Sequence, residues 1–275
     1  MKPQSTAKLY YRLACALTHL PWSWQRTLAD TVAWLWRSIN ARESRVTRRN
    51  LELVYPELDA AQRARLHREV LRTTARQALE TLYLWTHDPA RNLSRHLRER
   101  HGEALYDAAL ASGKGVIVIA PHYGNWELLN QWLASRGPIA IVYAPPENPV
   151  GDEFLQLCRG GDNVRQVRAE GPAVRQLFKV LKEGGATGIL PDQQPKNGDG
   201  VFVPFFGIQA LTMTLVNRLA ERTGATLLYG WCERTGTNLD FALHIEPAEV
   251  QIADPDLQLA AATLSAGIER IARRD

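Results

Sequence analysis

The stretch Gly115-Val-Ile-Val-Ile-Ala-Pro-His-Tyr-Gly-Asn-Trp-Glu127 decides the predicted fold of this 275-residue chain. Its apolar run Val116–Ala120, rich in β-branched residues, is typical of a strand buried on both faces. Asn125 is then a suitable N-cap for a helix from Trp126 to about Arg136. The stretch therefore predicts a strand, a turn and a helix. It places His122 at the carboxyl edge of a sheet, where open α/β folds bind ligands.

The turn also carries a candidate catalytic pair, His122 and Glu127. Glu127 would lie in the first helical turn, close enough to orient the imidazole, and a histidine steered by a carboxylate is a general base for a hydroxyl or amine. A capping glutamate beside a packed histidine is the alternative. His244 has the same spacing to Glu249, but residues 240–250 are predicted as an edge strand with no helix after it. The strand–turn–helix context therefore favours His122.

Strand-like and helix-like segments alternate along the rest of the chain. Further helices are predicted at about 60–84, 93–111, 153–159, 172–183, 211–222 and 257–273, and further strands at 139–144, 186–190, 225–231 and 240–245. Alternation of this kind is typical of an α/β domain with a mostly parallel sheet flanked by helices on both faces.

The composition is that of a globular protein from a reducing compartment. Hydrophobic residues make up 45% and charged residues 23% of the chain, which excludes wholesale disorder. Cys15, Cys158 and Cys232 are far apart and form no C-x-x-C motif, so neither a disulfide framework nor a zinc site is expected. Cys158 lies in a predicted helix, which favours a buried structural thiol over a nucleophile. The first residues show no apolar core of the kind that signal peptides have, so no signal peptide is expected.

The N-terminal part of the chain is basic and rich in tryptophan. Residues 1–100 hold 18 Lys/Arg against 9 Asp/Glu. Charges interrupt Leu9–Trp36, which predicts two amphipathic helices divided near Pro21 rather than a membrane span. Tryptophan and arginine both favour a membrane surface. We therefore predict a membrane-facing helical segment at 1–45 and a catalytic domain at 46–275; helices that pack their tryptophans into a core are the alternative. The tryptophans are Trp22, Trp24, Trp34 and Trp36.

Several other functions are disfavoured by missing motifs. The arginines of residues 42–49 are accompanied by no zinc-finger spacing and no RNA-binding aromatic motif, so no nucleic-acid partner is expected. No serine occurs between Ser135 and Ser265, which excludes a G-x-S-x-G elbow in the sheet-forming region. No glycine-rich nucleotide loop is present. Without a covalent nucleophile, His122 would activate the hydroxyl of an acceptor for direct attack on an activated acyl group.

Four blocks of residues stand in a characteristic order over most of residues 45–225. They are Arg48-Arg49-Asn50-Leu51 with Tyr55-Pro56-Glu57-Leu58, then His122-Tyr-Gly-Asn-Trp-Glu127, then Asn148-Pro149 with Arg159, and finally Pro191-Asp192-Gln193-Gln194-Pro195 through Val203-Pro204-Phe205-Phe206-Gly207. In these blocks the chain resembles the bacterial lipid A biosynthesis late acyltransferases of the lauroyl- and myristoyltransferase type.

The resemblance implies a glycerolipid-acyltransferase-like fold. It also implies transfer of a fatty acyl chain from acyl carrier protein to a lipid A precursor, at the cytoplasmic face of the cell inner membrane. At the matching positions it implies His122 as general base, Glu127 as its orienting partner, and Arg159 as a group that stabilises substrate anions or the oxyanion. The remaining implied substrate-binding residues are Asn125, Asp192, Gln193 and Phe205. A turn anchored in the core is the alternative for the last block, and the chemistry requires no cofactor or metal.

Alternatives to this assignment remain at the level of the sequence. Asp192 and Asp199 are seven positions apart in a stretch predicted as a mobile loop rather than a metal site. The charge-broken N-terminus differs from the hydrophobic anchor common in the family, so peripheral or monotopic attachment is expected. The acceptor could be another membrane lipid, such as a phospholipid, mannolipid or polyene lipid. A membrane-surface lipid-binding protein without activity is the non-enzyme alternative, which the intact set of His122, Glu127 and Arg159 disfavours.

A basic stretch follows the arginine block. Its members are Arg165, Arg168, Arg175, Lys179 and Lys182. The last three recur at i, i+4 and i+7, on one face of a predicted helix. This face suits an acidic carrier protein, and an ordinary solvated face is the alternative.

Overall fold

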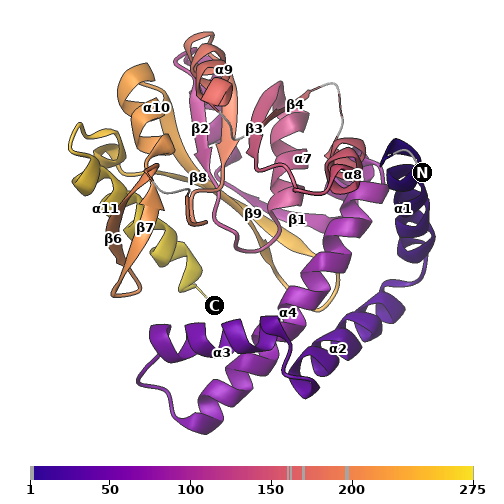
Figure 1. The fold of residues 1–275 in the computed structure, drawn as a ribbon. Helices are drawn as coiled ribbons and strands as arrows, with labels where there is room; N and C mark the ends of the chain where they lie inside the picture. Colours follow the sequence, from indigo (N-terminus) through magenta and orange to yellow (C-terminus); the bar gives the residue numbers. More distant parts are fainter. Residues whose placement is uncertain (1–2, 160, 162, 169–170, 196–197, 275) are drawn as a thin grey trace. The chain divides into compact units, whose positions relative to one another are not determined.

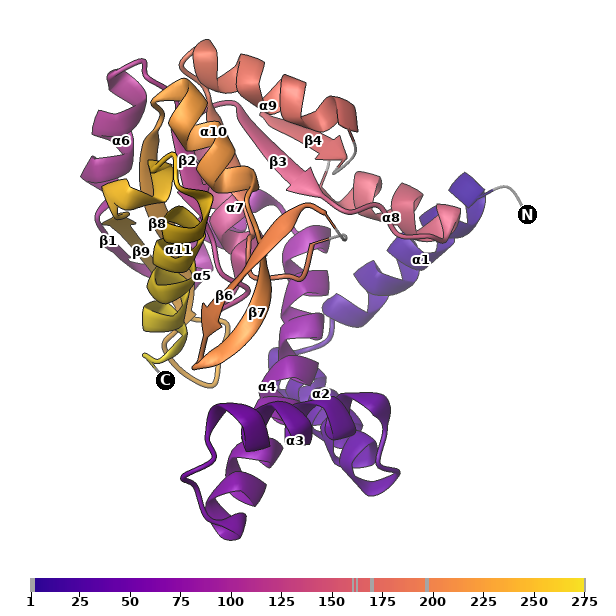
Figure 2. The ribbon, with the colours of Figure 1, turned by 60° about the vertical axis from the view of Figure 1, so that its left-hand side comes forward.

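The computed structural model of the chain describes residues 3–159, 161, 163–168, 171–195 and 198–274. Contacts divide the chain into two compact units, Lys8–His87 and Asp88–Asp275, and the second unit includes the residues up to Ala7. The smaller unit is helical and the larger one contains the sheet (Figure 1, Figure 2).

The part of the chain before His87 forms four helices. They are α1 (Pro3–Thr18), α2 (Trp22–Ser38), α3 (Arg42–Val54) and α4 (Ala60–Thr86). The separation of the first two at Pro21 confirms the predicted pair of helices. Helix α4 begins with a capping box, in which the Asp59 side chain accepts a hydrogen bond from Gln62 N at 2.8 Å and the Gln62 side chain accepts one from Asp59 N at 2.9 Å.

Helix α2 packs on α4 through small side chains. The buried cluster is formed by Ala29, Ala33, Leu71 and Ala75. Beside it, the Arg76 guanidinium donates to both carboxylate oxygens of Asp30, at 2.7 and 2.6 Å. This packing makes α4 part of the same compact unit as α2, so the unit extends to His87. The predicted division at residue 45 concerns membrane contact and stays a prediction.

The larger unit contains a seven-stranded sheet in the order β1-β9-β8-β2-β5-β3-β4. The strands are β1 (Leu97–His101), β2 (Val116–Ile119), β3 (Ile139–Tyr143), β4 (Val164–Arg168), β5 (Ala186–Ile189), β8 (Thr226–Arg234) and β9 (Phe241–Pro247). Five neighbouring strands, β8 to β4 in this order, are parallel; β9 is antiparallel to β8, and β1 is parallel to β9. The sheet is mostly parallel, as predicted.

Helices cover both faces of this sheet (Figure 1). They are α5 (Pro89–His96), α6 (Glu103–Ala111), α7 (Trp126–Arg136), α8 (Pro149–Arg159), α9 (Gly171–Lys182), α10 (Leu215–Thr223) and α11 (Leu257–Ala272), with the 3-10 helix η1 (Val250–Ala253). Helices α9, α10 and α11 contribute to a core cluster that contains Ile117 of β2. The next residue, Val118, points to the opposite face, where Leu129 of α7 is buried.

A two-stranded antiparallel hairpin, β6 (Gly200–Phe205) and β7 (Ile208–Met213), lies outside the main sheet. It is tied to α11, because Ser265 Oγ donates to Pro204 O at 2.8 Å. Of the loop predicted before this hairpin, Lys196 and Asn197 lie outside the described residues.

The stretch at 115–127 forms the predicted elements. All four residues of β2 are buried, α7 begins after Asn125, and Gly137 follows its last residue. The Asn125 side chain accepts a hydrogen bond from Leu128 N at 3.1 Å, which confirms it as the N-cap.

Three predicted elements differ from the structure. The segment 93–111 is not one helix: it contains α5, β1 and α6, because Gly102 takes a left-handed conformation (φ 80°) where a Cβ would lie 2.1 Å from Ile245 O. The segment 211–222 begins in strand β7 and becomes helical at Leu215. The strand predicted at the sheet edge, β9, lies between β8 and β1, and β1 forms the edge.

Candidate active site

His122 lies beyond the carboxyl end of β2, beside Asp192, which lies beyond the carboxyl end of β5. The two strands are adjacent and parallel, with Ile119 opposite Ile189. The backbone N–H of His122 donates to one carboxylate oxygen of Asp192 at 2.7 Å, and Nδ1 lies 2.6 Å from the other. Because a carboxylate only accepts, the Nδ1 contact places the ring proton on Nδ1. Nε2 is then the basic nitrogen.

The Nε2 side of the ring faces polar and aromatic neighbours. Gln193 Nε2 lies 3.2 Å from His122 Nε2, and the edge of the ring packs on Trp126 at 4.8 Å between centroids. The His122 side chain is 27% exposed. It is therefore held in position and still accessible to a substrate.

The carboxylate that contacts His122 is not the predicted one. Glu127 was expected to orient the imidazole, but Asp192 occupies that position. Glu127 instead pairs with Arg159: the Arg159 Nε lies 3.0 and 3.3 Å from the two carboxylate oxygens, and a terminal nitrogen also donates to one of them. The five-residue spacing identified two residues near one turn but assigned the carboxylate to the wrong partner.

The pair of Glu127 and Arg159 joins helix α7, which follows β2, to helix α8, which follows β3. Glu127 lies in the first turn of α7 and its side chain is only 4% exposed, whereas Arg159 ends α8 and is 18% exposed. A carboxylate this deeply buried is stable in the charged form only with a partner. Arg159 therefore neutralises Glu127 and fixes α8 against α7.

The turn between His122 and α7 depends on a close backbone approach. Gly124 has φ 63° and forms a bridge with Cys232 of β8, where a Cβ would lie 2.0 Å from the Cys232 oxygen. The next residue, Asn125, donates its backbone N–H to the same oxygen at 2.8 Å. Its side-chain Nδ2 is buried and has no hydrogen-bond partner within the described residues. Asn125 thus shapes the turn as its cap and retains one donor.

Phe205 lies at the end of β6, in the turn of the hairpin. Its ring packs edge-on against Phe206 at 4.8 Å and against the core cluster. Phe206 has a left-handed backbone (φ 50°) and donates its N–H to Glu269 of α11 at 2.6 Å. The structure thus anchors this turn in the core.

His244 also has a carboxylate neighbour, with Nε2 3.0 Å from Glu233, but its surroundings differ from those of His122. It is stacked between Trp231 and His101, and burial lowers its pKa, although nearby Glu233 opposes this shift. Glu249, the acid five residues further on, accepts a hydrogen bond from Tyr229 at 2.8 Å instead. The choice of His122 over His244 agrees with these contacts.

The sequence pattern does contain a signal for Asp192 that spacing alone missed. Strand β2 is followed by Ala120, Pro121 and His122, and strand β5 by Leu190, Pro191 and Asp192. In both cases an apolar residue and a proline separate the strand from a polar side chain. Since the carboxyl ends of parallel neighbours meet at one edge, the equal offsets bring the two side chains together.

Two members of the basic stretch have carboxylate partners, Arg168 on β4 and Lys179 on α9, where Glu183 lies 3.8 Å away. Arg168 contacts the Asp152 carboxylate and lies 3.3 Å from the Tyr143 hydroxyl. The side chains of Arg175, Lys179 and Lys182 are exposed along α9, as predicted for one helical face. Arg168 is therefore a structural contact of β4, whereas α9 presents a basic surface.

The cysteines of the described part of the chain differ in burial. Burial raises the pKa of the Cys232 thiol, and Cys158 is half-buried on α8 rather than fully buried. Within that part no three His, Cys, Asp or Glu side chains are grouped to hold a metal ion. Among its helices, none combines the length and apolar character that membrane crossing requires.

Sequence comparison agrees with this geometry. A model of the family described as bacterial lipid A biosynthesis acyltransferase matches residues 3–274. The chain belongs to this family. It is thus an acyltransferase of the lipid A late acyltransferase type, with a sheet and helices consistent with such a fold.

Similar proteins act on more than one class of lipid. The acyltransferase is 25% identical to the lipid A biosynthesis lauroyltransferase of Escherichia coli over 94% of this chain and 79% of the relative. It is 25% identical to the lipid A biosynthesis palmitoleoyltransferase of the same organism, over 90% and 82%. A phosphatidylinositol mannoside acyltransferase of Mycobacterium tuberculosis is 29% identical over 56% of this chain and 50% of its own length.

The buried pair of Glu127 and Arg159 generates a stability prediction. Glu127→Gln removes the charge of a buried carboxylate that pairs with Arg159 and should lower the free energy of unfolding by about 3 kcal/mol. Urea unfolding at neutral pH measures this change. Glu69→Gln, which breaks an exposed pair with Arg65 on α4, is the control and should change stability by less than about 0.5 kcal/mol. Equal effects of the two substitutions would contradict a structural role for the buried pair.

Proposed function

We propose that the acyltransferase moves a fatty acyl chain from acyl carrier protein to a hydroxyl of a lipid A precursor, with His122 as general base. The observation that carries this proposal is the contact between His122 and Asp192, which leaves Nε2 as the basic nitrogen of a partly exposed side chain. Similarity to two lipid A acyltransferases over most of the chain supports the choice of acceptor.

The reaction proceeds by direct transfer in this proposal. His122 Nε2 removes the proton of the acceptor hydroxyl as its oxygen attacks the thioester carbonyl of the donor. Asp192 keeps the imidazole in the productive tautomer and stabilises its protonated form. The tetrahedral intermediate then expels the thiol of the carrier, which recovers the proton from His122. Ester formation and thiol release balance the step without a cofactor.

Arg159 and Glu127 hold two helix ends in place for this step. Their ion pair fixes the end of α8 beside the first turn of α7, the helix whose N-terminus follows His122. A helix N-terminus and a guanidinium are both suited to an oxyanion. We propose that Arg159 stabilises substrate anions while Glu127 holds it in place. The proposed substrate contacts of Asn125, Gln193 and Phe205 complete the site.

The membrane contact is proposed from helix α2. Trp24, Leu28 and Leu35 are 68%, 44% and 46% exposed and recur at i, i+4 and i+11, on one stripe of the helix. This stripe lies opposite the buried Ala29 and Ala33. A helix that is apolar on both faces is suited to lie on the cytoplasmic leaflet of the inner membrane, with one face on the protein and the other on lipid.

A mannolipid acceptor is the second candidate. It is favoured by the similarity to the phosphatidylinositol mannoside acyltransferase, which covers half of each chain. Mass spectrometry of lipids extracted with and without the gene separates the two: a lipid A precursor that lacks one acyl chain in the absence of the gene supports the first candidate. An acylation defect confined to mannolipids would replace it with the second.

The role of His122 predicts a specific kinetic defect. His122→Ala should slow acyl transfer by about 10²–10⁴-fold, and Asp192→Asn should slow it comparably. The double variant should be little slower than either single one, because the two residues act as a unit. Single-turnover transfer from acyl carrier protein measures the step. His101→Ala, an exposed histidine of β1, is the control; a folded His122→Ala protein with the wild-type rate would remove the base from the mechanism.

The exposed face of α9 predicts the site of the donor. The double variant Arg175→Glu/Lys179→Glu should raise KM for acyl carrier protein about tenfold at low salt, because like charges then face an acidic partner. The matched control is Arg91→Glu/Arg95→Glu, an exposed i, i+4 pair on α5. The difference between the variants should shrink at high salt. Indistinguishable KM values at low salt would place the carrier elsewhere.

The α2 stripe predicts membrane retention. Replacing Trp24, Leu28 and Leu35 by serine should release the protein from vesicles, since three exposed apolar side chains are lost without disturbing the Ala29 face. Vesicle co-sedimentation measures retention. The control replaces exposed apolar residues of the larger unit by serine, namely Leu105, Val250 and Leu259. If both triple variants sediment as the wild type does, α2 is not the membrane contact.

A further inference from the structure

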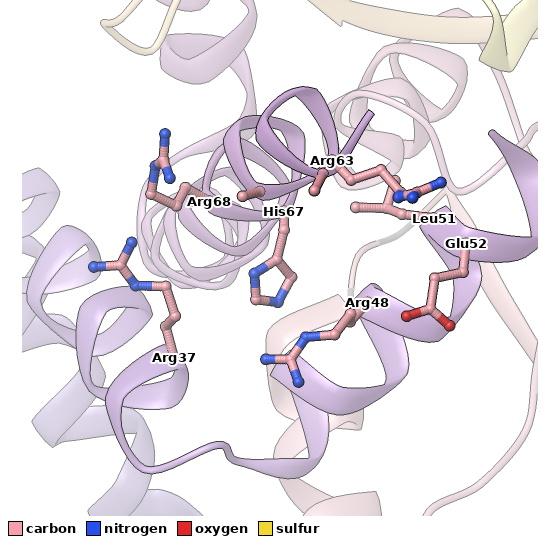
Figure 3. Close-up of a pocket in the computed structure, with 9 residues that line it drawn as sticks. Arg37, Arg48, Leu51, Glu52, Arg63, His67 and Arg68 are labelled. Atoms are coloured by element: carbon pink, nitrogen blue, oxygen red, sulfur yellow. The ribbon is translucent and has the colours of Figure 1, made fainter. Parts of the chain in front are cut away.

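Helices α2, α3 and α4 enclose a basic pocket of about 410 Å³ within the smaller unit. Arg37 of α2, Arg48 of α3 and Arg68 of α4 line it together with Arg63 and His67 of α4. Figure 3 shows the imidazole of His67 between the side chains of the three helices. We call this the arginine pocket.

The positive charge of the arginine pocket is not compensated. Among the described residues, Arg37, Arg48 and Arg68 form no ion pair. Glu52, the acidic residue of the lining, lies 3.2 Å from Arg49, which lies outside the lining. Several guanidinium groups around one pocket, whose carboxylate is paired with another arginine, are suited to bind phosphate.

The pKa of His67, which lines the pocket, is affected by the same arginine charges. It is 6% exposed, and its Nε2 lies 3.0 Å from the carbonyl oxygen of Ser44, which places the ring proton on Nε2. Burial lowers the pKa of His67; the hydrogen bond to Ser44 opposes this shift, and the charges of Arg48, Arg37 and Arg68 add to it. Charges from three helices therefore act on one buried, neutral side chain.

Exposed apolar side chains occur close to the arginines in sequence, two positions away and therefore on another side of the helical unit. Leu35 and Ile39 flank Arg37 and are 46% and 65% exposed, and Val46, two residues before Arg48, is 46% exposed. None of these three side chains lines the arginine pocket, but they give the same helical unit an exposed apolar surface. A lipid suits this combination, because basic side chains contact its phosphate while apolar side chains of the unit contact the acyl boundary.

We propose that the arginine pocket binds the phosphate group of an anionic lipid headgroup. Its volume is within the range of ligand sites. The guanidinium groups of Arg37, Arg48 and Arg68 contact the phosphate oxygens, and His67 forms part of the pocket behind them. This site goes beyond acyl transfer: it contains none of the residues that act on the ester bond, and it gives the helical unit a lipid specificity that surface charge alone does not provide.

Binding of a water-soluble lipid tests the proposal on the full-length chain. Dihexanoyl phosphatidic acid, used below its micelle concentration, should bind in calorimetry at least about tenfold more tightly than inorganic phosphate. The variant Arg48→Gln/Arg68→Gln should weaken this binding by at least about tenfold, the loss expected from removing charge-assisted hydrogen bonds. Arg45→Gln/Arg65→Gln is the matched control: it also removes one charge from α3 and one from α4, outside the lining and without touching the pair of Arg49 and Glu52, and should weaken binding by no more than about twofold.

A second readout follows His67 by NMR. A bound phosphate favours the protonated imidazole, so saturation with dihexanoyl phosphatidic acid should raise the pKa of His67 in the wild type and in the control. It should not do so in Arg48→Gln/Arg68→Gln. If thermal unfolding shows that this variant is not folded, Arg37→Gln replaces it, with at least about threefold weaker binding expected.

Three results would overturn the proposal. The first is no binding of the short-chain lipid by the wild type. The second is equal weakening in the pocket variant and the control, which would indicate general charge attraction. The third is inorganic phosphate that binds as tightly as the lipid, which would make the pocket a site for a free anion.

Discussion

Parallel pairing of β2 with β5 is the constraint on which the candidate active site depends. The register sets Ile119 opposite Ile189, and each strand continues for three residues to a polar side chain, so His122 and Asp192 meet although they are 70 residues apart. On its other side β2 pairs with β8, where only glycine at position 124 permits the backbone approach. Strand pairing thus fixes both the position of the imidazole and the turn that leads from it into α7.

Two acids near His122 have different structural tasks because their surroundings differ. Asp192 contacts both the imidazole and the backbone N–H of His122. The contact lies at the edge of the sheet where His122 is partly exposed. Glu127 is buried, and the partner that balances its charge is Arg159, on another helix. A loss of activity on replacing Glu127 would therefore be ambiguous, since the same change also loosens α8. Loss on replacing Asp192 is closer to the chemistry, because that carboxylate holds the ring itself.

The sequence predicted the parts of the fold that have strong local signals. The buried run of β2 and the cap at Asn125 defined strand, turn and helix correctly, and so did the charge-broken helices around Pro21. Strand β1 was missed because only Leu97 in it is buried, which leaves no alternation to recognise. The partner of His122 was assigned wrongly for a different reason. Strand order is a long-range property, and a five-residue spacing contains no information about which strand lies next to β2 in the sheet.

Helix α2 of the smaller unit has apolar side chains on two different faces. Alanines on α2 permit its close approach to α4, while larger apolar side chains on the opposite stripe stay exposed. A soluble bundle would be expected to place the large side chains inside and polar ones outside. On α2, Val32 and Trp36 pack against the alanine cluster, and the exposed stripe is the part of the helix that we propose to contact lipid. At the end of this helix Arg37 joins Arg48 and Arg68 in a pocket whose acidic residue, Glu52, pairs with Arg49, so the apolar and basic contacts that we propose for a membrane lipid belong to a single helical unit.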